Sequence, residues 1–226
     1  MKTLVYARRL VIVVRHALFR SVGESAVNCT VQSPNWAVFF STIAIAIFQF
    51  QGTDMPTTKQ AVAAIVRHIG LDEGRVGAVA RALTDDSVLP PGAPGKSPDL
   101  SPQDVASLML GAALDVPLRA VADAVATYRE LTPAGTPIDV LPASLQYAAG
   151  NFLDGLADYP ENARHLRIEV VSTWREITIH YADGSTRRFV EPGADASRWQ
   201  SNGHRRSTVI NGAAFADAVR DLFGGK

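Results

Sequence analysis

The sequence has almost no cysteine, no excess of either charge and no hydrophobic run long enough to span a membrane. Cys29 is the one cysteine, so the chain cannot form an intramolecular disulfide or a thiolate metal cluster. Its 22 basic and 22 acidic residues balance, so no global field directs it to nucleic acid, and any such contact must be local. The composition fits a reducing cytoplasm.

Catalytic and cofactor-binding motifs are also missing. The five histidines are scattered and form no spaced pair of metal ligands. Residues 92–97 read GAPGKS, which ends like a phosphate-binding loop, but Pro90 stands where the first glycine of GxxxxGK is required. The sequence therefore predicts a protein that is not an enzyme, holds no metal or cofactor, and shows no evident small-molecule substrate.

The first 54 residues differ in composition from the rest. They carry five basic and two acidic residues, and their longer apolar run, WAVFFSTIAIAIFQF, has 15 residues, which is short of the roughly 20 that a spanning helix needs. Gln51 and Gly52 can be encoded by a purine-rich ribosome-binding sequence upstream of an ATG at Met55. We expect translation to begin at Met55, which makes residues 1–54 a non-native leader and predicts no membrane contact. The alternative is a weak membrane-proximal segment.

Two helical patterns with a short turn between them follow Met55. The first has apolar residues at helical spacing from Val62 to Ile69 and ends at Gly70. Asp72 can cap the second, whose apolar positions run from Val76 to Leu83. The connection is about three residues long and contains a glycine, which is typical of a helix-turn-helix.

A loop rich in proline and glycine separates this pair from a strongly capped third helix. The loop begins with SVLPPG and continues as GAPGKSPDL. Ser101, with Pro102 at the first helical position and Asp104 at the third, predicts the start of the third helix in SPQDVASLML. A fourth helical pattern runs from Leu118 to Tyr128.

This order of elements resembles the MerR-like winged helix-turn-helix proteins over roughly residues 57–131. The resemblance implies that the second helix enters the major groove of double-stranded DNA and that the loop forms a wing along the backbone. On this hypothesis Arg75 and Arg81 read guanine, while Lys96 and Lys59 hold phosphate. Four basic contacts per protomer are few, so we expect a homo-oligomer, most simply a dimer.

The remainder changes from helical to strand-like spacing. Residues 132–142 are expected to form a connector and residues 143–159 a helix, and LRIEVVS then alternates apolar and charged positions. Asp183-Gly184 predicts a β-hairpin, and a final helix runs from Asn211 to Gly224. Four arginines in this part form a possible second basic surface: Arg187, Arg188, Arg205 and Arg206. The alternatives are a sheet with one packed and one charged face, and a dimerisation edge.

The sequence thus predicts an α+β protein: an amino-terminal winged helix-turn-helix, a helical connector, and a small carboxy-terminal α+β unit with an antiparallel hairpin and a final helix. The expected segments are residues 1–54, 55–131, 132–162 and 163–226. The predicted function is that of a cytoplasmic transcriptional regulator of bacterial or phage type that acts as a dimer. The alternatives are a small terminase subunit for phage DNA packaging and a non-enzymatic protein adaptor, which the acidic segment from Asp99 to Glu161 favours.

Overall fold

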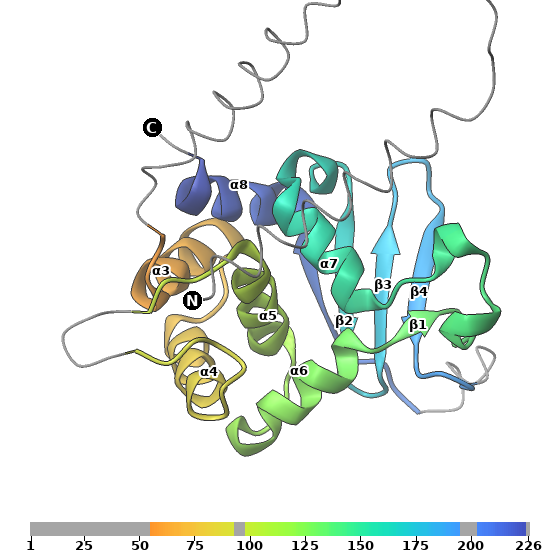
Figure 1. The fold of residues 1–226 in the computed structure, drawn as a ribbon, viewed down its shortest axis with the longest axis horizontal. Coiled ribbons are helices and arrows are strands. Elements are labelled where there is room, and N and C mark those ends of the chain that lie inside the picture. The colour runs from red at the N-terminus through yellow and green to blue at the C-terminus, as the bar shows by residue number, and fades with distance from the viewer. Residues whose placement is uncertain (1–54, 93–97, 195–202, 225–226) are drawn as a thin grey trace, which may run out of the picture. The chain divides into compact units, whose positions relative to one another are not determined.

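A computed structural model describes residues 55–92, 98–194 and 203–224, in which helices pack on one antiparallel sheet (Figure 1). This arrangement confirms the expected α+β class with an antiparallel sheet and a final helix. None of the helices in the described ranges has the length and apolar character needed to cross a membrane.

The sheet has five strands in the order β1-β4-β3-β2-β5. Their bounds are β1 Thr132–Pro133, β2 Arg167–Val171, β3 Glu176–His180, β4 Thr186–Val190 and β5 Ser207–Asn211. The predicted hairpin is confirmed: β3 pairs with β4, and Gly184 supplies the positive φ of 84° in the turn between them. The pairing of β1 with β4 was not predicted, because Thr132 and Pro133 were expected in a connector.

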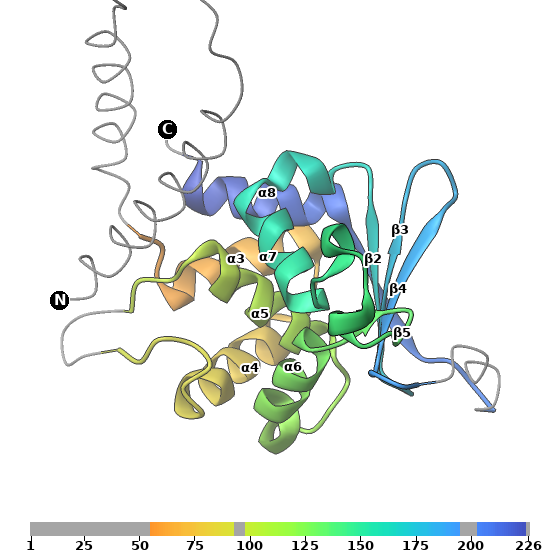
Figure 2. The same ribbon diagram turned by 45° about the vertical axis from the view of Figure 1, so that its right-hand side comes forward.

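Alternation along the strands gives the sheet two chemically different faces. The face that carries Ile168 and Ile179 is buried against helices, whereas the opposite face carries Glu169 and Thr178. Figure 2 shows the helices gathered on one side of the strands, and no described helix covers the other side. Polar side chains on that second face therefore have to satisfy one another or meet water.

Six α-helices of the described ranges lie on the inner side of the sheet. They are α3 Thr58–Ile69, α4 Glu73–Asp85, α5 Pro102–Ala113, α6 Val121–Arg129, α7 Ala149–Asp158 and α8 Gly212–Phe223, with short 3-10 turns η1 Leu118–Ala120, η2 Ile138–Val140, η3 Ala143–Leu145 and η4 Pro160–Ala163. Four begin at a capping side chain that accepts a backbone hydrogen bond, as the sequence predicts: Thr57, Asp72, Ser101 and Asn211.

The helix predicted over residues 143–159 is wrong at its amino end. Residues Ala143–Leu145 form a 3-10 turn, and α7 begins at Ala149. The amide of Ala149 donates to the carbonyl of Leu131 at 2.8 Å, and the side chain of Asn151 accepts from the amide of Ala148 at 3.2 Å. These bonds fix the start of α7 at a place that local sequence preference does not mark.

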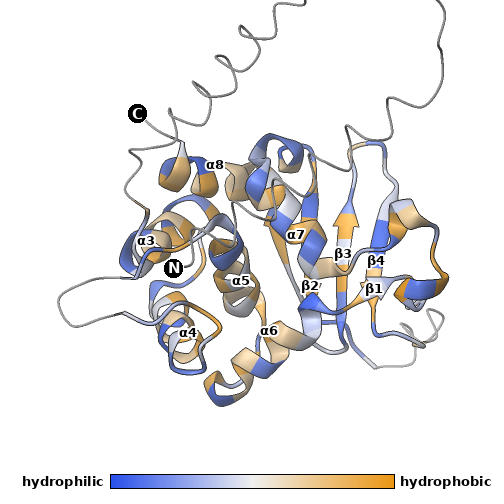
Figure 3. Cartoon of the chain, in the orientation of Figure 1, coloured by the Kyte–Doolittle hydropathy of each residue, from blue (hydrophilic) through white to orange (hydrophobic). Residues whose placement is uncertain are grey.

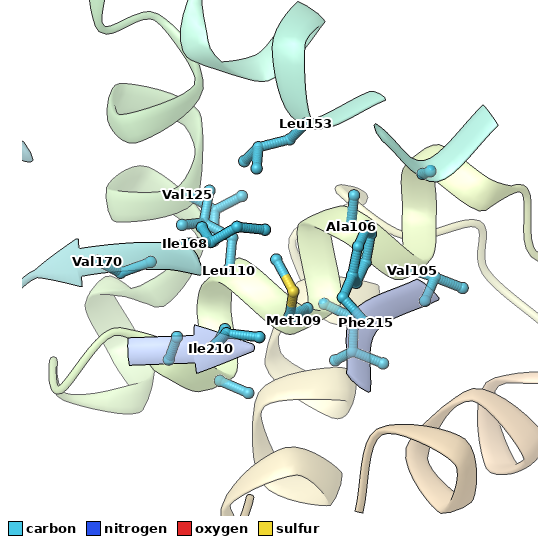
Figure 4. Packing of buried hydrophobic residues seen from close by; sticks show 14 of the residues in the cluster. Val105, Ala106, Met109, Leu110, Val125, Leu153, Ile168, Val170, Ile210 and Phe215 are labelled. Carbon is cyan, nitrogen blue, oxygen red and sulfur yellow. The ribbon is translucent and has the colours of Figure 1, made fainter. Parts of the chain in front are cut away.

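Helix α5 lies at the centre of the core. Its residues from Val105 to Ala113 are all buried, and it packs against α4, α6, α7 and α8. Figure 4 shows Met109 of this helix beside Phe215 of α8, with Ile210 of β5 nearby. The outer helices α4 and α8 carry apolar and polar residues on different sides (Figure 3). One continuous core therefore joins the helices to the sheet.

The start of α8 depends on a close backbone approach at Gly212. Its amide donates to the carbonyl oxygen of Leu166 at 2.9 Å. A Cβ atom at this position would lie 2.7 Å from that oxygen and would collide with the carbonyl oxygen of Ala163. Only glycine therefore lets α8 pack directly on the turn that precedes β2.

Gly212→Ala should lower the free energy of unfolding by about 2 kcal/mol or more, because the backbone of η4 or α8 must shift to admit the methyl group. Gly155→Ala is the matched control, since a Cβ atom on Gly155 of α7 meets no atom within 4 Å. The control should leave stability unchanged or raise it by up to about 1 kcal/mol. Urea unfolding of both variants measures the difference, and equal midpoints would contradict the close approach.

Candidate functional site

The first candidate site is the pair of helices α3 and α4. Gly70 ends α3 in the left-handed conformation with φ of 78°, and the side chain of Asp72 accepts the amide of Arg75 at 2.7 Å to begin α4. Residues 70–72 are thus the short turn that the sequence predicts. The exposed side of α4 carries Arg81 between Glu73 and Asp85, so its local charge is mixed.

The loop after α4 is fixed at both ends. The amides of Val88 and Leu89 both donate to the carbonyl of Leu83, at 2.8 and 3.0 Å, and Leu89 is fully buried. At the other end Leu100 is fully buried and its amide donates to the carbonyl of Pro56 at 2.9 Å. An antiparallel bridge between Thr57 and Asp99 accompanies this bond. The loop therefore leaves the fold at the end of α4 and re-enters it beside the start of α3.

The four predicted DNA contacts have different environments. Lys59 and Arg81 are exposed and form no ion pair or hydrogen bond with another described residue. Lys96 lies outside the described residues. Arg75 is partly buried, and one nitrogen of its guanidinium donates to the carbonyls of Leu114 and Val116 at 2.7 and 2.8 Å. It thereby ties the start of α4 to the segment that follows α5.

The four arginines of the possible second basic surface are separately engaged. Arg188 and Arg205 bind carboxylates on the open face of the sheet, and Arg206 pairs with Asp115 at 2.5 Å. Arg187 belongs to the opposite, helix-covered face and donates to the hydroxyl of Tyr147. The structure therefore does not bring these four residues together as one unpaired cationic surface.

A charged network centred on Glu176 occupies the open face of the sheet. Arg188 binds its carboxylate through two bonds, from Nε to Oε1 at 3.0 Å and from Nη2 to Oε2 at 2.7 Å. Thr178 and Trp174 donate to the same carboxylate at 2.6 and 2.7 Å. Although it lies on a face without a helix, the Glu176 side chain is only 1% exposed. The side chains that donate to this carboxylate thus take the place of the water molecules that would otherwise solvate it.

Arg205 links Glu176 to a second carboxylate, Glu169. Its guanidinium donates to Glu169 at 3.0 Å and to Glu176 at 3.4 Å, and its central carbon lies 5.1 Å from the centre of the Trp174 ring. His180 contacts Glu169 through Nε2 at 2.9 Å. The sequence shows these charged and aromatic residues interleaved along the strands, but their partners follow from the register of β2, β3 and β4, which the sequence does not specify.

The network keeps its carboxylates ionised. Burial alone would raise the pKa of Glu176, but hydrogen bonds from Arg188, Thr178 and Trp174 outweigh it and lower the pKa to about 2. Burial likewise opposes ionisation of Glu169, and bonds from Arg205, Ser207 and His180 lower its pKa overall. Because these pKa values are lowered, both side chains are ionised at neutral pH and hold no proton that they could donate. The network is therefore suited to rigidity and not to acid catalysis.

Metal binding has no comparable support within the described ranges. No group of three or more histidine, cysteine or acidic side chains there is arranged to hold an ion.

Arg75→Ala should lower the free energy of unfolding by about 2 kcal/mol, because it leaves two carbonyls without their charged donor. Arg81→Ala is the matched control on the exposed side of the same helix and should change stability by less than about 0.5 kcal/mol. Urea unfolding at neutral pH compares them. Equal stabilities would mean that the Arg75 bonds contribute nothing to the fold.

Acidification should selectively weaken the Glu176 network. Because the pKa of Glu176 falls from 4.5 to about 2 on folding, its contribution to stability is present above about pH 4.5 and is lost as the pH falls toward 2. Glu176→Gln should cost about 3 to 5 kcal/mol at pH 7, since the partly buried Arg188 would lose its two charge-assisted bonds to this carboxylate. It should also flatten the loss of stability between pH 4.5 and 2.

Glu191→Gln is the control for that experiment. Glu191 pairs with Arg175 at the surface, where both side chains are about half exposed (45% and 53%). The control should cost less than about 1 kcal/mol and should keep the acid dependence. Thermal or urea unfolding across this pH range gives both quantities, and parallel pH profiles for the two variants would refute the role of Glu176.

Comparisons with known proteins add no family to this description. Protein-family models, curated proteins and solved structures all give no significant match to the chain.

Proposed function

We propose that this protein binds double-stranded DNA through a winged-helix-like unit made of α3, α4, the loop after α4, and α5. The observation that carries the proposal is the anchoring of that loop. Leu89 and Leu100 hold its two ends in the core, and the bridge between Thr57 and Asp99 sets it beside the start of α3. A flexible linker would not need two buried stems, whereas a wing that must lie along a DNA backbone does.

The net charge of the described residues limits how the protein can bind DNA. The described residues include 14 lysines and arginines and 19 aspartates and glutamates, which gives −5 with histidine neutral. Non-specific affinity for DNA rises with the number of phosphates that basic side chains neutralise. We assign the contacts to Lys59, Arg81 and the predicted wing residue Lys96. Arg75 is assigned to the scaffold because carbonyls occupy its guanidinium.

So few contacts per protomer favour a dimer, which doubles the number of phosphates reached. A role as a transcriptional regulator follows from the resemblance to MerR-like proteins and is an analogy at the level of fold. The second candidate is a non-enzymatic protein adaptor. The net negative charge of the described residues favours it, because an acidic surface repels nucleic acid but not a basic partner protein.

DNA binding is tested by fluorescence anisotropy of a labelled duplex with the full chain over a series of salt concentrations. Binding should weaken steeply as salt rises. Lys59→Ala should weaken all sequences alike and reduce the salt slope by about 1 for each bound protomer. Arg81→Ala should cost about 1 to 3 kcal/mol at a guanine that it contacts and relax sequence preference there.

Arg167→Ala is the matched control. Arg167 is an exposed arginine at the start of β2, on the open face of the sheet, with no hydrogen bond or ion pair to another described residue. It should bind DNA as the unmodified chain does. Absence of binding at low salt would favour the adaptor, and an equal loss in Arg167→Ala would reduce the interaction to general charge attraction.

A further inference from the structure

An open groove of about 560 Å³ lies between α7, η4 and the ends of the strands β2 and β3. Small-molecule sites commonly have volumes of about 300 to 1,000 Å³. Four aromatic rings and two side-chain amides line the groove: Tyr147, Phe152, Tyr159 and Tyr181, with Asn151 and Asn162. On α7 the lining residues are spaced about four apart, so that one face of the helix forms one wall.

The aromatic wall is held in place by Arg187, which does not itself line the groove. The central carbon of its guanidinium lies 5.6, 5.8 and 5.9 Å from the ring centres of Tyr147, Phe152 and Tyr181. The rings of Tyr147 and Phe152 lie at 20° to each other, and both contact the fully buried Phe189, at 6.1 and 5.6 Å between centres. Such a preformed wall loses little conformational entropy when a ligand binds.

The charges around the groove restrict the ligand. No charged side chain lines it within the described residues, so an anion would find no ion-pair partner. The guanidinium of Arg187 lies within 6 Å of the centres of three of the rings, so its charge would repel a second cation beside them. What remains available is stacking on aromatic rings and hydrogen bonding to two amides, each of which offers donors and an acceptor.

We propose that this groove binds a neutral, planar heteroaromatic molecule of the size of a nucleoside. Its ring stacks on the tyrosine and phenylalanine rings, and its polar edge bonds to Asn151 and Asn162. Tyr159, 69% exposed, forms the outer rim. The site is separate from the proposed DNA contact, because no residue of α3, α4 or α5 lines it. Its test needs no DNA, so the two proposals can fail independently.

Gly155 offers a variant that blocks the groove from within. It lies on α7 in the lining, and a Cβ atom there meets no atom within 4 Å. Gly155→Leu should therefore fill the groove without displacing the core, and it replaces glycine by a better helix former. Gly77→Leu is the matched control, because Gly77 lies on α4 outside the lining and a Cβ atom there likewise meets no atom within 4 Å. Tyr159→Ala removes the exposed ring and serves as a second variant whose truncation leaves the core intact.

Isothermal titration of the full chain with adenosine measures the binding. The unmodified chain and Gly77→Leu should bind adenosine with the same Kd, and Gly155→Leu and Tyr159→Ala should bind about tenfold more weakly or worse. Benzyltrimethylammonium and benzoate, which carry a ring with a positive or a negative charge, should bind more weakly than adenosine. Circular dichroism and the unfolding midpoint check that Gly155→Leu folds, and if its midpoint falls, Tyr159→Ala decides.

The proposal would be overturned by no heat of binding with adenosine, by undiminished binding in both variants, or by tighter binding of either charged probe. A tighter Kd for N-acetyltryptophanamide than for adenosine would also overturn it. That result would reassign the groove to an aromatic side chain of a protein partner.

Discussion

Burial of α5 from Val105 to Ala113 is the constraint on which the other elements depend, because a helix that is enclosed on all sides needs partners in every direction. α4 supplies one side, and α6, α7 and α8 supply the others. The expected DNA-binding region and the sheet therefore share one core. Gly111 illustrates how tight this packing is, since a Cβ atom there would lie 3.0 Å from a side-chain carbon of Val79 in α4.

Arginine pairing explains why the composition of the tail is a poor guide to its surface. Arg188 and Arg205 are committed to Glu176 and Glu169, and Arg164 to Glu161 and Asp217. In the sequence Arg188 and Arg205 each stand beside a second arginine. In the fold the charges of all three arginines are neutralised by nearby carboxylates, and Arg188 and Arg205 help to seal the sheet face that no described helix covers. The planar guanidinium group of arginine can bind either a phosphate or a carboxylate through two hydrogen bonds. In this fold, carboxylates of the same chain lie within its reach.

The sequence allowed prediction of those features that arise from neighbouring residues. Helix caps such as Ser101 with Asp104 are bonds across three positions, and the Asp183-Gly184 turn needs only its own two residues. Features that join distant segments were not predictable. The pairing of Thr132 with Val190 and the packing of three rings around Arg187 depend on which distant segments the fold brings together. The burial of Ala106 and Leu110 in α5 also depends on distant segments, because the helix is enclosed on every side.

The packing of α3 against α8 has a consequence for how the chain is made. These are the first and last helices of the described residues, and Arg67 and Asp221 join them by an ion pair at 3.1 Å. The apolar face of α3, with Ala61 and Ile65, has no cover from α8 until that helix has left the ribosome. Contacts of such long sequence separation slow folding, and this unit cannot complete its fold before α8 has been synthesised. In the interval a newly made chain exposes part of its core to whatever chaperones or neighbouring chains it meets.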